Sequence, residues 1–303
     1  MIRGERGCCT QSMVAYSVTP VGKTDSVRIT SHSKTVAVVV PGYKRSQFTD
    51  DEETSFRHLE RYLGHYDKFL VVPRSLSIER PGFQLKRFDD AFFGSAIANT
   101  RLMLSETFYG SFIDYQYILI YQLDALIFSD QLLEWCATDL DYIGAPWLIC
   151  EDSPWVSKPR VGNGGFSLRN VHSFLRVLSS DKYWIDPDAY WAMISSRHSG
   201  LARYLHFPRK VLTHIKSFNN IKWELRQWHS RPDATRNEDH FWADHAIRYD
   251  PDFKVAPFDV GLRFAFEVNP RQCFEMNGRR LPFGCHAWQR YDRSFWEPYL
   301  IKE

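Results

Sequence analysis

The chain has 303 residues, 44% hydrophobic and 24% charged, a composition typical of a globular protein that can bury a full core. Its formal net charge of +2 argues against a generic nucleic-acid binder, so we expect no nucleic-acid partner. The six cysteines show no CxxC pair and no zinc spacing, and the sequence contains neither a signal-peptide core nor an uninterrupted apolar run of about 18 residues. These features predict reduced thiols and a cytoplasmic protein.

The first predicted elements follow residues 1–33, which mix Gly, Ser, Thr and charges without a period and are expected to form a flexible leader. Residues 36–40 (VAVVV) form a β-branched run that ends at a Pro-Gly pair, which is typical of a buried parallel strand. Residues 50–66 combine acids in a first turn with apolar side chains at helical spacing, and DKFLVVP at 67–73 predicts a second strand.

A second helix and a third strand come next along the chain. Residues 94–110 carry apolar side chains at helical spacing and lead into the apolar run YQYILIYQLDALIF at 115–128. Alternating strands and helices predict a doubly wound α/β sheet, in which ligands collect at the carboxyl ends of the strands. Because the sequence has no internal repeat, we expect one continuous domain over residues 34–303.

An aspartate interrupts the most apolar of these strands. Asp124 follows YILIY by only two residues, so we expect it near the carboxyl end of a central strand. It either holds a hard divalent cation together with phosphate and water, or caps the next turn of the chain. The apolar run continues past it, and buried acids are rare, so the functional interpretation is preferred.

Three later features each have two interpretations. The segment VGNGGFSLRN at 161–170 either lets the backbone approach a ligand or makes a turn, and it matches neither GxxxxGK[ST] nor GxGxxG. Glu238 and Asp239 either begin a helix capped by Asn237 or supply a general base. His286 is either a structural residue or a ligand. The sequence lacks GxSxG, HExxH and CxxC, which excludes serine hydrolase, zincin and zinc-ribbon sites.

Several segments, taken in order, carry a family resemblance. YQLDALIF, DYIGAPW, VGNGGFSLR, NED and LPFGCHAW resemble the motifs of the DUF5672 family, bacterial and viral proteins regarded as glycosyltransferases of the GT-A type. The resemblance covers about residues 35 to 300. It implies a GT-A-like, Rossmann-like α/β fold, with a doubly wound mixed sheet flanked by helices in a single domain.

The resemblance also implies a metal site. GT-A enzymes carry D-x-D at the end of a central strand, which binds Mn²⁺ or Mg²⁺ on a nucleotide-sugar diphosphate, and Gln122-Leu123-Asp124 is the similar element here. Asp124 is therefore an expected metal ligand, and His286 matches the late histidine that completes the site in families such as glycogenin. Gln122 offers only a neutral amide oxygen or a hydrogen bond, which leaves strict metal dependence open.

The other expected site residues follow from the fold and the resemblance. Arg101 matches a basic residue that reaches the donor, and the glycine-rich segment is similar to the one that shapes the donor-sugar pocket. The loop after the first strand should hold the nucleoside, with Tyr43 as a stacking face. NED resembles the acidic motif of inverting galactosyltransferases, so Glu238 or Asp239 is the expected catalytic base. The expected donor-binding residues are Pro41, Tyr43, Arg45, Arg101, Gln122, Asn163, Gly164 and Gly165.

The implied function is transfer of a hexosyl or pentosyl group from a nucleotide sugar, a uridine diphosphate sugar by preference, to an acceptor hydroxyl. The acceptor would be a glycan or a lipid-linked glycan, as in polysaccharide biosynthesis. An alternative is a non-catalytic protein that binds a sugar or a nucleotide on the same fold, which Gln122 favours. A metal-dependent phosphoester hydrolase ranks lower, because it needs a denser cluster of carboxylates and histidines.

A basic segment lies between the glycine-rich segment and NED. Residues 197–236 contain nine Lys or Arg and two acids, a local charge of +7, and Phe207, Val211, Ile215 and Phe218 recur at helical intervals. The preferred interpretation is a helix packed on the domain with a solvated basic face. The alternative is peripheral contact with an anionic acceptor at the inner face of the cytoplasmic membrane.

Overall fold

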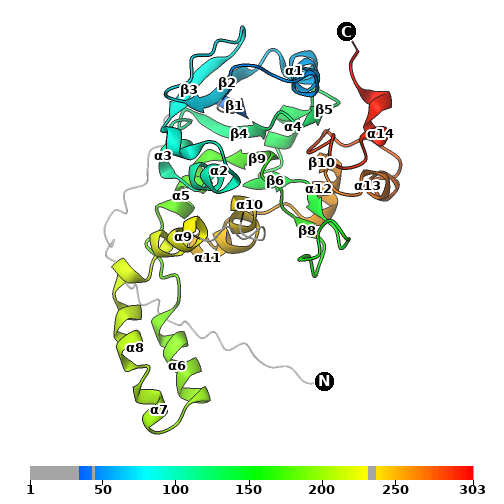
Figure 1. Cartoon of the computed structure of the whole chain (residues 1–303). Coiled ribbons are helices and arrows are strands. Elements are labelled where there is room, and N and C mark those ends of the chain that lie inside the picture. Colours follow the sequence, from blue (N-terminus) through cyan, green and yellow to red (C-terminus); the bar gives the residue numbers. More distant parts are fainter. Residues whose placement is uncertain (1–33, 43–44, 231–236, 303) are drawn as a thin grey trace, which may run out of the picture. The chain divides into compact units, whose positions relative to one another are not determined.

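A six-stranded mixed sheet is the centre of the structure, a computed structural model that describes residues 34–42, 45–230 and 237–302 (Figure 1). The predicted leader, residues 1–33, lies outside the described residues. The strands of this sheet are β1 (Lys34–Pro41), β2 (Asp67–Pro73), β3 (Gln84–Phe88), β4 (Tyr115–Tyr121), β6 (Tyr142–Gly144) and β9 (Phe166–Asn170).

The strand order is β3-β2-β1-β4-β9-β6. The first four neighbours pair in parallel, whereas β9 runs antiparallel to both β4 and β6. The chain moves outward from β1 to β2 and β3, and then returns to place β4 on the other side of β1. The predicted α/β class with a mixed, doubly wound sheet is confirmed.

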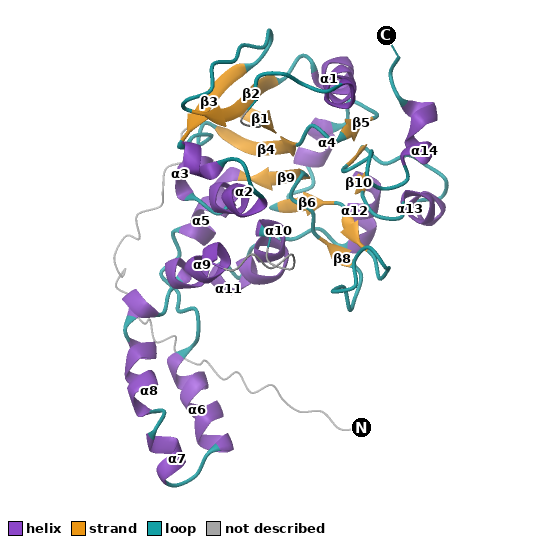
Figure 2. Cartoon of the chain, viewed as in Figure 1, coloured by secondary structure: helices purple, strands orange, loops and turns teal. Residues whose placement is uncertain are grey.

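Both faces of the sheet are covered, which explains the continuous apolar runs of its inner strands. Successive residues of β1 alternate between two clusters, with Ala37 and Val39 in one and Val38 and Val40 in the other. Helix α1 (Asp50–Leu63) packs in the second cluster (Figure 2). The first cluster is covered by α2 (Ala96–Met103), α3 (Glu106–Gly110), α5 (Val171–Leu178) and α9 (Ile221–Ser230).

Helix α1 begins as its sequence predicts. The Thr49 side chain accepts a hydrogen bond from the backbone of Glu52, whose carboxylate accepts one in return from the Thr49 N–H. The predicted helix at 94–110 is instead two helices. Ser105 interrupts it, because its hydroxyl accepts from the N–H of Phe108 and so caps the start of α3.

A smaller part of the fold surrounds a third apolar cluster near the C-terminus. This part contains the three-stranded sheet β10-β11-β5. The strands β7 and β8 form a separate two-stranded sheet. The remaining elements are α4 (Leu132–Cys136), β5 (Leu126–Ile127), β7 (Pro146–Trp147), β8 (Arg160–Val161), α10 (Glu238–His240), α11 (Ala246–Tyr249), α12 (Phe258–Phe264), β10 (Ala265–Phe266), α13 (Pro270–Met276), β11 (Gly284–Cys285) and α14 (Arg293–Trp296). Among the described residues, Cys136, Cys150, Cys273 and Cys285 are free thiols.

The basic segment differs from the preferred prediction. It forms the end of α6 (Pro187–Arg197), α7 (Leu201–Tyr204), α8 (Phe207–His214) and α9, and its last residues, 231–236, lie outside the described residues. Helix α9 packs as expected through Ile221, Leu225 and Trp228. The apolar side chains of α8 and the turn after it are exposed, so a single helix packed on the domain is wrong for this half of the segment. In the part of the chain that the structure describes, no helix is both long and apolar enough to cross a membrane.

Candidate functional site

A cavity of about 700 Å³ opens at the carboxyl ends of β1 and β4. Pro41, the last residue of β1, and Gly42, directly after it, form part of its wall, and Gln122, directly after β4, forms another part. The strand order reverses between β1 and β4, because β2 and β3 lie beyond β1 whereas β9 and β6 lie beyond β4. Doubly wound folds leave a ligand crevice at such a reversal. The opposite wall comes from the glycine-rich segment and from residues 237–240.

His286 is at the centre of this site. It follows β11, and its Nε2 atom lies 3.2 Å from Asp124 Oδ1 and 3.2 Å from Gln122 Oε1. Asp124 Oδ1 is buried, and the His286 imidazole is its ion partner. Two oxygens and one nitrogen therefore converge on the same side of the imidazole ring.

These three atoms fit part of a cation site. Adjacent ligands of an octahedral Mg²⁺ with bonds of about 2.1 Å are about 3 Å apart, close to the two separations at Nε2. The fit is limited to this trio, because the described residues contain no group of three or more His, Cys, Asp or Glu side chains able to hold a metal ion. The remaining ligands would have to come from phosphate oxygens and water.

Glu267, which the sequence analysis missed, holds the other side of His286. Its Oε1 lies 2.9 Å from Nδ1, and the Asn163 amide nitrogen lies 3.0 Å from the same atom. A carboxylate on one ring nitrogen directs the lone pair of the other toward a metal site. The available signal was the acid in the apolar run AFEV at 265–268, the same kind of interruption that marked Asp124.

The charges of this group are coupled. Burial by itself would lower the pKa of His286, but the Asp124 and Glu267 carboxylates raise it to about 10. Burial likewise opposes ionisation of Asp124, yet the charge of His286 outweighs it and holds the pKa of that carboxyl below its ordinary value. In the cation-free protein the site is thus an imidazolium between two carboxylates.

The glycine-rich segment has no room for side chains at two of its glycines, because His286 and Glu238 lie directly against its backbone. A Cβ atom on Gly165 would lie 2.0 Å from His286 Nε2, and one on Gly164 would lie 1.9 Å from Glu238 Oε1. Asn163 adopts a left-handed conformation with φ of 70°, and its Oδ1 accepts hydrogen bonds from the N–H groups of Gly165 and Phe166. The segment is therefore a turn and also a wall that side chains of two other segments touch.

Glu238 is tied to Arg169, a second residue that the sequence analysis missed. The Arg169 guanidinium, fully buried on β9, donates to Glu238 Oε1 at 2.9 Å, to the Tyr109 hydroxyl at 2.8 Å and to the Gly164 carbonyl at 3.0 Å. Burial raises the pKa of Glu238, although the Arg169 charge opposes the shift. Oε1 of this carboxylate is thus held by Arg169, whereas Oε2 is buried without a hydrogen-bond partner among the described residues.

Asp239 differs from its neighbour. It is half-buried in the cavity wall, and its Oδ1 accepts a hydrogen bond from the His240 N–H at 2.9 Å. Burial, followed by the nearby charge of Glu267, raises the pKa of Asp239 to about 6. Asn237 occupies the predicted cap position without a side-chain capping bond, and the helix continues through a π-helical turn, Phe241–His245, a distortion common at functional sites.

Two other expected donor-binding residues, Arg101 and Arg45, do not line the cavity. The Arg101 guanidinium donates to the His229 carbonyl at 3.0 Å, in the last turn of α9, where carbonyls lack helical partners. Arg45 contacts Glu52 at 2.5 Å, and Tyr43 lies outside the described residues. Arg290 instead lines the cavity and lies near enough to lower the pKa of Asp124.

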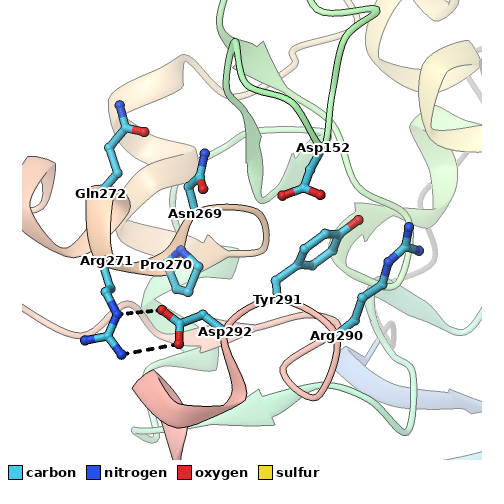
Figure 3. Close-up of a pocket in the computed structure, with 8 residues that line it drawn as sticks. All are labelled: Asp152, Asn269, Pro270, Arg271, Gln272, Arg290, Tyr291 and Asp292. Atoms are coloured by element: carbon cyan, nitrogen blue, oxygen red, sulfur yellow. Dashed lines mark hydrogen bonds and ion pairs between the residues drawn. The ribbon is translucent and has the colours of Figure 1, made fainter.

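A second cavity of about 540 Å³ adjoins the first (Figure 3). The two share Asp152, Arg290 and Tyr291, and the Tyr291 ring lies between the other two side chains in this view. On the far side, Arg271 contacts Asp292 through two nitrogens at 2.6 and 3.2 Å. The structure thus offers two neighbouring polar spaces with a common wall.

Comparison with solved structures finds weak similarity to two glycosyltransferases. The apo form of glycosyltransferase GlyE from Streptococcus pneumoniae TIGR4 aligns with a TM-score of 0.43 and 13% identity over 89% of this chain and 61% of that chain. This chain thus corresponds to less than two thirds of the length of GlyE. A glycosyltransferase involved in the glycosylation of the major capsid of PBCV-1 aligns with a TM-score of 0.42 and 11% identity over 88% and 98% of the two chains.

No curated protein sequence matches the chain. A family model does match, described as "Protein of unknown function (DUF5672)", over residues 82–286. This region is more than half of the chain and includes Asp124, Glu238, Asp239 and His286. The resemblance found in the sequence motifs is confirmed, and the chain belongs to the DUF5672 family.

Proposed function

We propose that this protein is a glycosyltransferase that moves a sugar from a nucleotide-sugar donor, preferentially a uridine diphosphate sugar, to an acceptor hydroxyl. The observation that carries the proposal is the composition of one cavity wall. The convergent donor atoms of Gln122 and His286 and the carboxylate of Asp239 line the same crevice at the switch point of the sheet.

Asp124, His286 and Gln122 are the residues that would hold Mn²⁺ or Mg²⁺. When bound, such a cation would offset the negative charge that develops on the diphosphate leaving group. Glu267 would keep the imidazole oriented toward this position. Arg290, at the shared wall of the two cavities, would add a fixed positive charge on the same side.

Asp239 is our candidate for the catalytic base. As the bond from the anomeric carbon to the diphosphate breaks, the acceptor oxygen bonds to that carbon and its proton passes to the Asp239 carboxylate, with inversion of configuration. A pKa of about 6 leaves Asp239 ionised near neutral pH and still basic enough to take this proton. Glu238 would instead support the Gly164 wall through Arg169.

Aromatic groups are placed to face a sugar. Trp147 and Trp155 line the cavity, with ring centroids 4.3 and 6.3 Å from that of the His240 imidazole. Burial lowers the pKa of His240 to about 4, so the ring is neutral and presents an uncharged surface. Flat apolar faces of this kind suit the axial C–H groups of a sugar ring.

The competing proposal is a binding protein that recognises a nucleotide sugar without turnover. It is favoured by the neutral Gln122 and by the lack of a three-residue metal cluster among the described residues, which also weighs against a phosphoester hydrolase. Nucleotide release should be measured over a panel of UDP and GDP sugars, with and without Mn²⁺, beside thermal-shift binding. Release that Asp239→Asn abolishes supports transfer, whereas a thermal shift without release supports the binding protein.

A further inference from the structure

Helices α7 and α8 and the turn after α8 carry apolar side chains that no other described segment buries. We define the hairpin face as Leu201, Tyr204, Leu205, Phe207, Val211, Leu212, Ile215 and Phe218. The exposed fractions of these side chains range from 40% at Ile215 to 80% at Leu201. Scattered exposed apolar residues are ordinary, but a continuous set along two successive helices marks an interaction surface.

The basic side chains of the hairpin partly face inward. Helix α6 packs against α8, burying Tyr190 and Ile194. The charged ends of Arg203 and Lys210 lie 5.2 and 4.5 Å from the centre of the Trp191 ring on α6. A helix at the protein surface ordinarily buries its apolar side chains and exposes its charged ones. Here two cations stack on α6 while the leucines are exposed.

The helical hairpin formed by α6, α7 and α8, with the turn that follows α8, carries an excess of positive charge. Residues 187–218 contain five Lys or Arg and one acid, a local charge of +4 in a chain whose formal net charge is +2. Arg197 and Arg209 are exposed, and the Arg209 guanidinium also lies 5.5 Å from the centre of the Tyr190 ring on α6. An anionic partner would therefore complement the hairpin, whereas a second copy of it would bring like charges together.

We propose that the hairpin face is a membrane-docking surface, which inserts its apolar side chains at the interface of an anionic bilayer while its basic residues contact the lipid headgroups. Apolar and basic side chains side by side on short helices have the chemistry of interfacial binding. No covalent lipid or spanning helix is required. The inference concerns a different surface from the cavity, so it stands or falls independently of the transferase activity.

The test is sedimentation of the full chain with vesicles of phosphatidylcholine alone or with one quarter phosphatidylglycerol. We expect binding to the anionic vesicles only, and a steep loss between low and high salt. Arg197→Gln with Arg209→Gln should weaken binding about 25-fold at low salt, about fivefold for each charge. Leu201→Glu with Leu205→Glu should weaken it by about tenfold or more.

Leu133→Glu is the matched control, since Leu133 is 53% exposed on α4, outside the hairpin, and should leave vesicle binding unchanged. Circular dichroism and thermal shift with the nucleotide sugar check that each variant folds. The proposal is overturned if the protein stays in the supernatant with all vesicles, or if Leu133→Glu weakens binding as much as the hairpin variants do. It is also overturned if light scattering shows a dimer that Leu201→Glu with Leu205→Glu dissociates, because the face is then occupied by a second copy.

Discussion

Removal of the buried Arg169 guanidinium should destabilise the protein far more than removal of a comparable surface arginine. Arg169→Met deletes donors to Glu238, Tyr109, Gly164 and Ser167, all at 2.8 to 3.0 Å. It leaves Glu238 buried without its ion partner, and loss of one member of a buried pair costs about 3–5 kcal/mol. At about 2–4 °C per kcal/mol for a domain of this size, the melting temperature should fall by roughly 10 °C.

The control is Arg271→Met. Arg271 also contacts a carboxylate, Asp292, through two nitrogens, but its side chain is 63% exposed. Water screens an exposed pair and leaves it little net stabilising effect, so the melting temperature should hardly change. The two arginines thus have similar bonding and opposite burial.

The double variant Arg169→Met with Glu238→Gln separates the pair from packing effects. Because the second change removes the unpaired buried charge, the double variant should recover about 2–3 kcal/mol relative to the sum of the single ones. Urea unfolding followed by circular dichroism measures the unchanged protein, Arg169→Met, Glu238→Gln, the double variant and Arg271→Met. Equal losses for Arg169→Met and Arg271→Met, or strictly additive losses in the cycle, would refute the reasoning.

The remaining predictions concern the cavity. Asp239→Asn should lower kcat by about 10²–10⁴-fold with little change in donor affinity. In the unchanged protein, kcat/KM should decrease as the pH is lowered through an apparent pKa of about 6, because the base must be ionised. A value of kcat/KM that stays constant down to pH 5 would exclude this base. Gly165→Ala should displace the His286 ring by about an ångström, since the new Cβ would lie 2.0 Å from Nε2. Mn²⁺ binding measured by calorimetry should then weaken about 10–100-fold. An unaltered Mn²⁺ affinity would mean that the cation binds elsewhere. Gln122→Asp should tighten Mn²⁺ binding by exchanging a neutral oxygen for a charged one, and Asp124→Ala should abolish it without unfolding the chain; if neither change alters the calorimetric affinity, these side chains are not ligands.

Local patterns in the sequence were sufficient for the architecture. The β-branched run of β1, the apolar run of β4 and the acid-rich start of α1 each report burial or capping within a few residues, so their order predicted the doubly wound sheet. Asp124 stood out because a charge in an apolar run is locally visible, and the motif order predicted the family. That Asp124 and His286 lie together is likewise consistent with the motif-based expectation.

Only the tertiary structure determines which polar residues contact one another at the site. Glu238 and Asp239 are adjacent in sequence, equal in charge and both in the cavity wall, yet Arg169, 69 residues before Glu238, contacts only Glu238. Glu267 reaches His286 across 19 residues, a contact without local periodicity. The exposure of the apolar side chains of α8 depends on which face α6 covers, because helical spacing identifies an apolar stripe but not what packs against it.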